Sequence, residues 1–206
     1  MNRNIAIAAF AVALAALGGV WAATEFASSD DQFAQCRATK IHGGAGAIGG
    51  PFELVNGEGL TVTDKDVITE PSLIYFGYTF CPDVCPLDVA RNAEAIDVLG
   101  ERKQSVTPVF ISIDPERDTP EVVADFAFNL HERMIGLTGS EAQVKAASQA
   151  YKTYYKKQLT GDEYYLMDHT TLSYLVLPEH GFVEFFRRDA SPEQVADRVG
   201  CFLEQI

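Results

Sequence analysis

The chain has 206 residues, of which 16 are basic and 29 acidic, so its formal net charge is −13, and 47% of its residues are hydrophobic. These values are typical of one globular domain and exclude a disordered or collagen-like chain. So large an excess of acid also argues against nucleic acid as a partner, because the phosphates would repel it.

The first feature along the chain is an uncharged N-terminal stretch whose apolar core covers residues 5–23. Its 19 residues come close to the ~20 that a membrane-spanning helix needs. Small residues around Ala23 also permit a cleaved signal peptide, but the stretch exceeds the usual signal core of about 7–15 residues. Arg3, the only charge before it, favours a cytoplasmic N-terminus. We predict a membrane anchor over residues 1–26, with the cleaved signal as the alternative.

This orientation places the rest of the chain outside the cytoplasm, in the bacterial periplasm or, in a eukaryote, the mitochondrial intermembrane space. Such compartments permit cysteines to form disulfides or to bind metals. The chain has four cysteines, Cys36, Cys81, Cys85 and Cys201. The predicted location therefore makes all four candidates for pairing or for metal binding.

Residues 27–50 are polar at first and then rich in glycine, a composition that supplies no packed face. We predict a flexible tether there, followed by one domain over residues 51–206. That domain opens with apolar runs at residues 52–55 and 60–63 around an Asn-Gly turn, which predicts a β-hairpin.

Two runs too apolar to be half exposed follow, at residues 73–78 and 109–113, and they alternate with helical patterns. Such alternation predicts βαβ units. Residues 172–177 and 182–186 flank a turn and predict a second hairpin. The expected fold class is therefore α/β, with a mixed sheet flanked by helices and an added N-terminal hairpin.

Three helices are expected to begin at recognisable caps, which are Thr119, Ser140 and Ser191. A fourth helix follows Cys85. The apolar positions expected to face the sheet are Leu87, Ala90, Ala93, Ile96 and Leu99 in that helix, and Val122, Phe126, Leu130, Val144, Ala147, Tyr151, Val195, Val199 and Phe202 in the others.

Cys81 and Cys85 lie where the strand at residues 73–78 passes into this fourth helix, at the carboxyl edge of the predicted sheet. We expect the helix N-terminus to lower the pKa of both thiols. Cysteines four residues apart share one helix face and can bind one ion, whereas redox pairs usually have two residues between them. The spacing alone leaves three interpretations: metal ligands, a dithiol redox pair or a disulfide.

Two thiolates and one imidazole suit copper(I) with three ligands or copper(II) in a tetragonal site. We favour His169 as the imidazole, because it precedes the strand at residues 172–177 in a loop that can reach the cysteines. The other histidines lie in the tether, at a helix end and in a turn, and they are His42, His131 and His180. For Cys36 and Cys201 we favour a structural disulfide over two unrelated thiols.

Four blocks of the chain resemble, in the same order, the Sco/SenC family of copper-binding proteins, over roughly residues 52–203. They are FCPDVCP at residues 80–86, VFISIDPERDTP at 109–120, GLTG at 136–139 and DH at 168–169. The resemblance implies a thioredoxin-like fold in which Cys81, Cys85 and His169 match the family's ligands for one copper ion.

The resemblance further implies a metallochaperone that helps to assemble the binuclear copper centre of cytochrome c oxidase subunit II. The alternative is a membrane-anchored thiol–disulfide oxidoreductase that reduces the oxidase's copper-site cysteines or signals redox state. Thioredoxins keep a cis-proline opposite their cysteines, but this chain has no proline between Pro120 and Pro178, which favours copper handling. A peroxidase is disfavoured, because it needs an arginine beside the thiolate and the sequence does not place Arg117 there.

Overall fold

The computed structural model describes residues 10, 12–19, 31–38, 45–158 and 164–206. The chain divides into two units, residues 1–35 and residues 36–206. Residues 12–19 of the first unit are helical. Within the described part of the chain, no helix has both the length and the apolar character to cross a membrane. Most of the predicted anchor over residues 1–26 lies outside the described residues.

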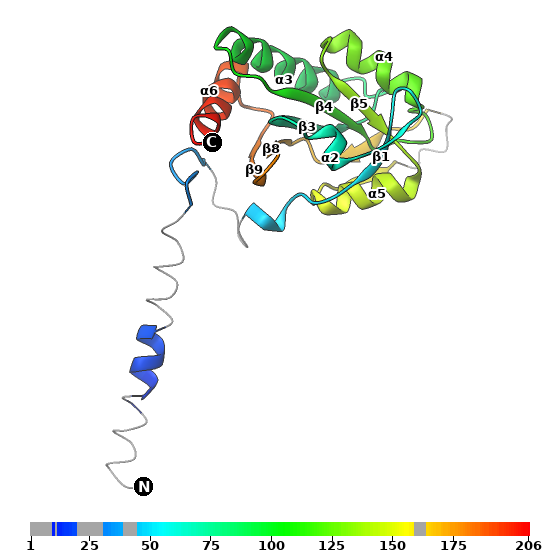
Figure 1. Ribbon diagram of the computed structural model, residues 1–206. Helices are drawn as coiled ribbons and strands as arrows, with labels where there is room; N and C mark the ends of the chain where they lie inside the picture. The colour runs from blue at the N-terminus through cyan, green and yellow to red at the C-terminus, as the bar shows by residue number, and fades with distance from the viewer. Residues whose placement is uncertain (1–9, 11, 20–30, 39–44, 159–163) are drawn as a thin grey trace. The chain divides into compact units, whose positions relative to one another are not determined.

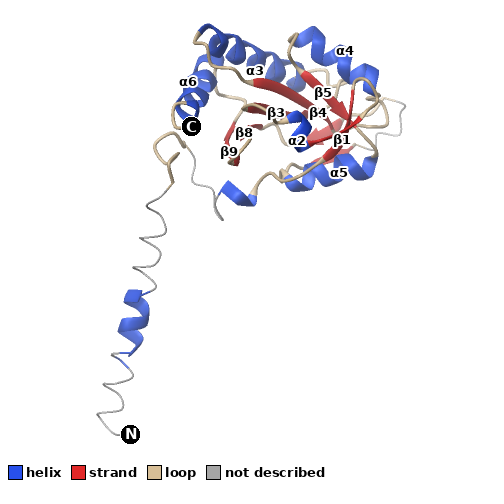
Figure 2. Ribbon diagram, in the orientation of Figure 1, coloured by secondary structure: helices blue, strands red, loops and turns tan. Residues whose placement is uncertain are grey.

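The second unit is built on a seven-stranded mixed sheet, which confirms the predicted α/β class (Figure 2). The strand order is β2-β1-β5-β4-β3-β8-β9. β3, β4 and β5 are parallel, and the other neighbours are antiparallel. The strands are β1 (Glu53–Asn56), β2 (Thr61–Thr63), β3 (Ser72–Gly77), β4 (Thr107–Ser112), β5 (Ile135–Thr138), β8 (Ser173–Leu177) and β9 (Gly181–Phe186).

Helices cover both faces of this sheet: α3, α4 and α6 lie on one face and α5 on the other (Figure 1). The helices are η1 (Ala45–Ala47), α2 (Asp64–Val67), α3 (Val84–Glu101), α4 (Pro120–Leu130), α5 (Glu141–Ala150) and α6 (Pro192–Leu203). A separate two-stranded ladder joins β6 (Tyr155–Lys157) to β7 (Met167–His169). The sequence patterns predicted both hairpins of the main sheet but not β5, this ladder or α2.

The predicted caps of α4, α5 and α6 are confirmed, because Thr119, Ser140 and Ser191 each accept a hydrogen bond from a backbone N–H of the first turn. The predicted apolar stripes of α5 and α6 are buried as well. In α4 the fully buried pair is Val123 and Ala127, one position beyond the predicted stripe. The helix comes so close to β5 that a Cβ on Gly136 would lie 2.3 Å from the Val123 carbonyl oxygen.

The first turn of α3 corrects the predicted stripe, because the side chain of Leu87 is 61% exposed. The buried positions there are Cys85, Asp88 and Val89. Asp88 is accommodated inside because it accepts a hydrogen bond from the Tyr75 hydroxyl at 3.1 Å. Burial of a polar side chain costs little free energy when the side chain has a hydrogen-bond partner. The apolar pattern alone therefore predicted the wrong buried face for this turn.

Candidate metal centre

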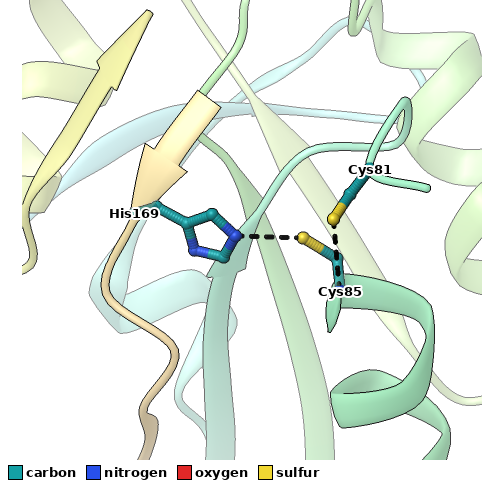
Figure 3. A group of neighbouring side chains, drawn as sticks. All are labelled: Cys81, Cys85 and His169. Carbon is teal, nitrogen blue, oxygen red and sulfur yellow. Dashed lines mark hydrogen bonds between the residues drawn. The ribbon is translucent and has the colours of Figure 1, made fainter. Parts of the chain in front are cut away.

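The site lies at the carboxyl edge of the sheet, where β3 ends at Gly77 and α3 begins at Val84. Cys81 lies in the connecting loop and Cys85 in the first helical turn (Figure 3). The Cys81 sulfur accepts a hydrogen bond from the Cys85 N–H at 3.3 Å. The side chain of Asp83 makes no such bond at the helix start. The sulfur of Cys81, a candidate ligand, therefore accepts a hydrogen bond from one of the backbone N–H groups that have no partner within the helix.

His169 is the last residue of β7, so the prediction that it lies in a loop was wrong. Its Nδ1 lies 2.9 Å from the Thr170 carbonyl oxygen, and because a carbonyl can only accept, Nδ1 carries the hydrogen. The lone pair of Nε2 is then directed at the Cys85 sulfur, 3.2 Å away (Figure 3). The rings of Tyr75 and Tyr78 are nearly perpendicular to the imidazole, and their centroids lie 6.2 and 5.9 Å from the imidazole centroid.

The structure thus brings together the three residues predicted as ligands, with ligand atoms that all lie within 4.8 Å of one another. A first-row ion such as zinc lies about 2.0–2.3 Å from nitrogen and sulfur ligands, which holds a ligand pair at most ~4.6 Å apart. The group therefore needs only a small closing movement to surround one ion. In the part of the chain that the structure describes, it is the only such group of three.

The two thiols differ in acidity. Burial raises the pKa of Cys85, which is fully enclosed. Burial also opposes ionisation of Cys81, but backbone N–H groups of Asp83 and Cys85 donate to its sulfur and bring the pKa of Cys81 below its usual value. The expectation that the helix N-terminus lowers both pKa values was therefore wrong for Cys85, because desolvation outweighs the dipole there.

Burial lowers the pKa of His169, which keeps its imidazole neutral at neutral pH. Neutral imidazole is the form that binds metals. The Nδ1 hydrogen bond to Thr170 also fixes the tautomer and the ring orientation, as neighbours of metal-binding histidines commonly do. His169 therefore has the protonation state and the tautomer that a metal ligand requires.

This asymmetry predicts that an alkylating reagent modifies Cys81 before Cys85. With iodoacetamide at pH 7.5, we expect Cys81 to react at least about tenfold faster, because only thiolates attack and one pKa unit changes the thiolate fraction about tenfold. Peptide mass spectrometry of metal-free protein, with the Cys36–Cys201 disulfide intact, measures both rates. Equal rates would contradict the assigned order of acidity.

Asp118 holds the loop that carries Cys81 against the sheet, a role that was not predicted from the sequence. Its buried carboxylate accepts the Thr79 N–H at 3.0 Å, the Thr79 hydroxyl at 2.6 Å and the Ser112 hydroxyl at 2.6 Å. Burial raises the pKa of Asp118, and these donors oppose that effect. Its place six residues after Ser112, the last residue of a buried strand, was the available signal.

Arg117 lies beside the motif but is engaged elsewhere. Its Nε donates to Asp114 at 2.5 Å and its Nη1 to the Tyr165 carbonyl at 3.0 Å. The guanidinium stacks on the Tyr165 ring at 3.6 Å and contacts the Phe80 ring at 4.8 Å. Arg117 therefore packs against aromatic rings and hydrogen-bonds to Asp114 and Tyr165. These contacts give no support to a peroxidase, which needs an arginine beside the thiolate.

Cys36 and Cys201 form a disulfide, with Cα atoms 5.6 Å apart and 165 residues of separation. Two further contacts hold the same segment, because the Ala38 N–H donates to Glu184 at 2.9 Å and the Arg37 guanidinium lies 6.0 Å from the Phe202 ring. Residues 36–38 are thus fastened to α6 and β9.

Two other histidines, His131 and His180, do not join the metal-binding group. His131 lies 3.3 Å from Asp97 and His180 lies in the β8–β9 turn, whereas His42 is outside the described residues. Of the two acidic residues beside the motifs, Asp168 accepts a hydrogen bond from Gln158 at 2.5 Å, and Asp83 is exposed. The cysteine pair and His169 therefore carry the site.

Fold and site together define a thioredoxin-like domain with a two-cysteine, one-histidine group at the carboxyl edge of its sheet. The family model described as SCO1/SenC matches residues 41–204, and the chain therefore belongs to the SCO1/SenC family. Membership predicted from four short blocks is confirmed over most of the chain.

Protein SenC of Rhodobacter capsulatus is 51% identical over 206 residues, which cover 100% of this chain and 92% of that protein. The structure of Arabidopsis thaliana ScoI with copper bound matches with a TM-score of 0.73 and 40% identity, over 78% of this chain and 100% of that one. Copper-bound ScoI of Bradyrhizobium japonicum matches with a TM-score of 0.68 and 40% identity, over 75% and 98%.

Proposed function

We propose that this protein is a copper metallochaperone that binds one copper ion through Cys81, Cys85 and His169. The observation that carries the proposal is the convergence of these three ligand atoms within 4.8 Å. Two thiolates and an imidazole are donors that suit copper in either oxidation state. The copper-bound structures of two 40% identical relatives support the same choice of metal.

We propose different tasks for the two sulfurs. Cys81 is 8% exposed and carries the more acidic thiol, so an incoming or accepting protein meets it first. Cys85 is fully buried and adjoins the imidazole, so it holds the inner side of the ion and must release its proton to bind. Copper then leaves by ligand exchange that begins at Cys81.

We further propose that residues 1–26 anchor the protein in a membrane and that the domain lies outside the cytoplasm. The uncharged stretch at residues 5–23 supports the anchor. The disulfide between Cys36 and Cys201 supports the location, because such bonds persist in oxidising compartments. The family resemblance supports cytochrome c oxidase subunit II, with its binuclear copper centre, as the acceptor.

A copper titration tests the proposed metal site. The chain lacking residues 1–23, with Cys81 and Cys85 reduced, is titrated with copper(I) and copper(II) against a competing chelator. We expect one-to-one binding, with sulfur-to-copper charge-transfer absorption in the copper(II) form. Binding so weak that an equimolar chelator removes the metal would contradict the proposal.

A second candidate function is thiol–disulfide exchange. The specific observation is the pairing of an acidic, partly accessible Cys81 with a buried, less acidic Cys85, an asymmetry that suits attack by one thiol and resolution by the other. A disulfide between them would remove two copper ligands, so copper loading and redox state are coupled in either function.

A further inference from the structure

Among the described residues, β7 is the only strand that pairs with β6, so the outer edge of β6 has no strand beside it. In an antiparallel pair, residues that exchange hydrogen bonds alternate with residues that do not. The Thr170 N–H donates to the Tyr154 carbonyl at 2.9 Å, and the Gln158 N–H donates to the Leu166 carbonyl at 2.8 Å. The hydrogen-bonding groups of β6 that face β7 are therefore those of the even-numbered residues.

The backbone groups of Tyr155 and Lys157 consequently point away from β7. Their own partners in the register, His169 and Met167, are the pairs that exchange no hydrogen bonds. Among the described residues, no backbone hydrogen bond outside this ladder uses their N–H or C=O groups. Two donors and two acceptors, on alternate residues about 6.6 Å apart, thus form an unpaired strand edge.

This edge borders a cleft of about 590 Å³. The opposite wall comprises residues 113–116, which follow β4, and residues 139–141, which lead into α5. Met167 also lines the cleft, and it lies two residues before His169 on the same strand. The cleft therefore opens at the carboxyl ends of β4 and β5, next to the metal centre at the end of β3.

We propose that this cleft docks an extended segment of the protein that receives the copper. This inference rests on the proposed function. The segment adds to the outer edge of β6 as a third strand. An unpaired strand edge recognises another extended backbone, because its donors and acceptors recur at every second residue.

The position of the edge identifies the copper acceptor as the occupant. Neighbouring strands lie about 4.8 Å apart, so an added strand would run roughly 10 Å from β7, which carries His169. Three extended residues span that distance at about 3.3 Å each. A segment that passes Tyr155, the partner of His169 in the register, thus carries its own ligands to the metal group.

The charges on the walls indicate what kind of segment fits. Lys157 pairs with Glu116 at 2.6 Å, so these opposite charges compensate each other within the lining. Ile113, Pro115 and Met167 contribute apolar surface. An extended segment with small or apolar side chains suits this lining better than a strongly charged one.

Substitution of Lys157 by proline tests the backbone contact. Proline removes the outward N–H but no donor to β7, so the ladder is retained. Lys157→Ala is the matched control, because it removes the Glu116 ion pair and keeps the N–H. The readouts are copper affinity, by chelator competition, and the rate of copper transfer from the full chain in detergent to the metal-free soluble domain of cytochrome c oxidase subunit II.

We expect both variants to bind copper within about twofold of the wild type. Transfer should slow about fivefold in Lys157→Pro and less than twofold in Lys157→Ala, because loss of one backbone hydrogen bond of about 1 kcal/mol changes a rate about fivefold. Equal transfer rates in the two variants would overturn the docking inference and leave the proposed function standing. Tight copper binding without any transfer by the wild type would reject the chaperone function and this inference with it.

A measurement on the unmodified chain covers the case in which proline disturbs the fold. Hydrogen exchange of the Tyr155 and Lys157 amides should be fast in the free protein and at least about tenfold slower with the subunit II domain present. Unchanged exchange in the complex would overturn the inference. Protection that depends instead on the concentration of the chain alone would assign the edge to a second copy, which also overturns it.

Discussion

Substitution of His169 by alanine is expected to weaken copper binding by more than about 100-fold, because residues that only orient a metal ligand already change affinity 10- to 100-fold. His169 supplies the Nε2 lone pair, 3.2 Å from the Cys85 sulfur, and the described part of the chain offers no other imidazole there. The loss should appear in chelator competition and as disappearance of the copper(II) charge-transfer band. Cys85→Ser should give a loss at least as large.

The same variant separates the two candidate functions. Removal of His169 leaves both cysteines, so the rate of dithiol–disulfide exchange should stay within a few-fold of the wild type. His180→Ala is the matched control, because this histidine lies in the β8–β9 turn, and it should change neither property. Retention of copper affinity by His169→Ala would reject the metal site. Oxidase assembly that survives the loss of copper would instead favour the thiol–disulfide function.

The cysteine pair could be placed from the sequence because its surroundings are regular. An apolar run ends shortly before Cys81 and a periodic helix begins beside Cys85, so the strand-to-helix junction could be recognised. His169 could be chosen by elimination among four histidines. Its strand could not be predicted, because β6 and β7 have three residues each and the run from 155 to 157 ends in two lysines.

The acidity of the thiols shows where local patterns fail. The helix start predicts a lowered pKa for both cysteines, yet burial raises the pKa of Cys85. Burial depends on what packs over the first turn, including the Tyr75 hydroxyl that reaches Asp88 beneath it. Asp118 was missed for a related reason, because a carboxylate that accepts bonds from Thr79 and Ser112 looks in the sequence like any polar residue.

Replacement of both Cys36 and Cys201 by serine is expected to lower the free energy of unfolding by about 5 kcal/mol. The disulfide closes a loop of 165 residues, and cross-linking restricts the unfolded chain more as the loop lengthens. This value is a large share of the roughly 5–15 kcal/mol that stabilises a typical domain. Urea unfolding should show a lower midpoint and a steeper dependence on urea, because the unfolded variant is less compact.

The control for this prediction uses Cys81→Ser/Cys85→Ser protein, in which thiol exchange with the metal centre is impossible. Reduction of its remaining disulfide should reproduce the loss of stability, whereas the variant without Cys36 and Cys201 should not respond to a reductant. A loss below about 1 kcal/mol would mean that the contacts of Arg37 and Ala38 hold the N-terminal segment without the bond. The disulfide would then be dispensable for the fold. Its entropic contribution would be small because the reduced, unfolded chain retains structure that already restricts it.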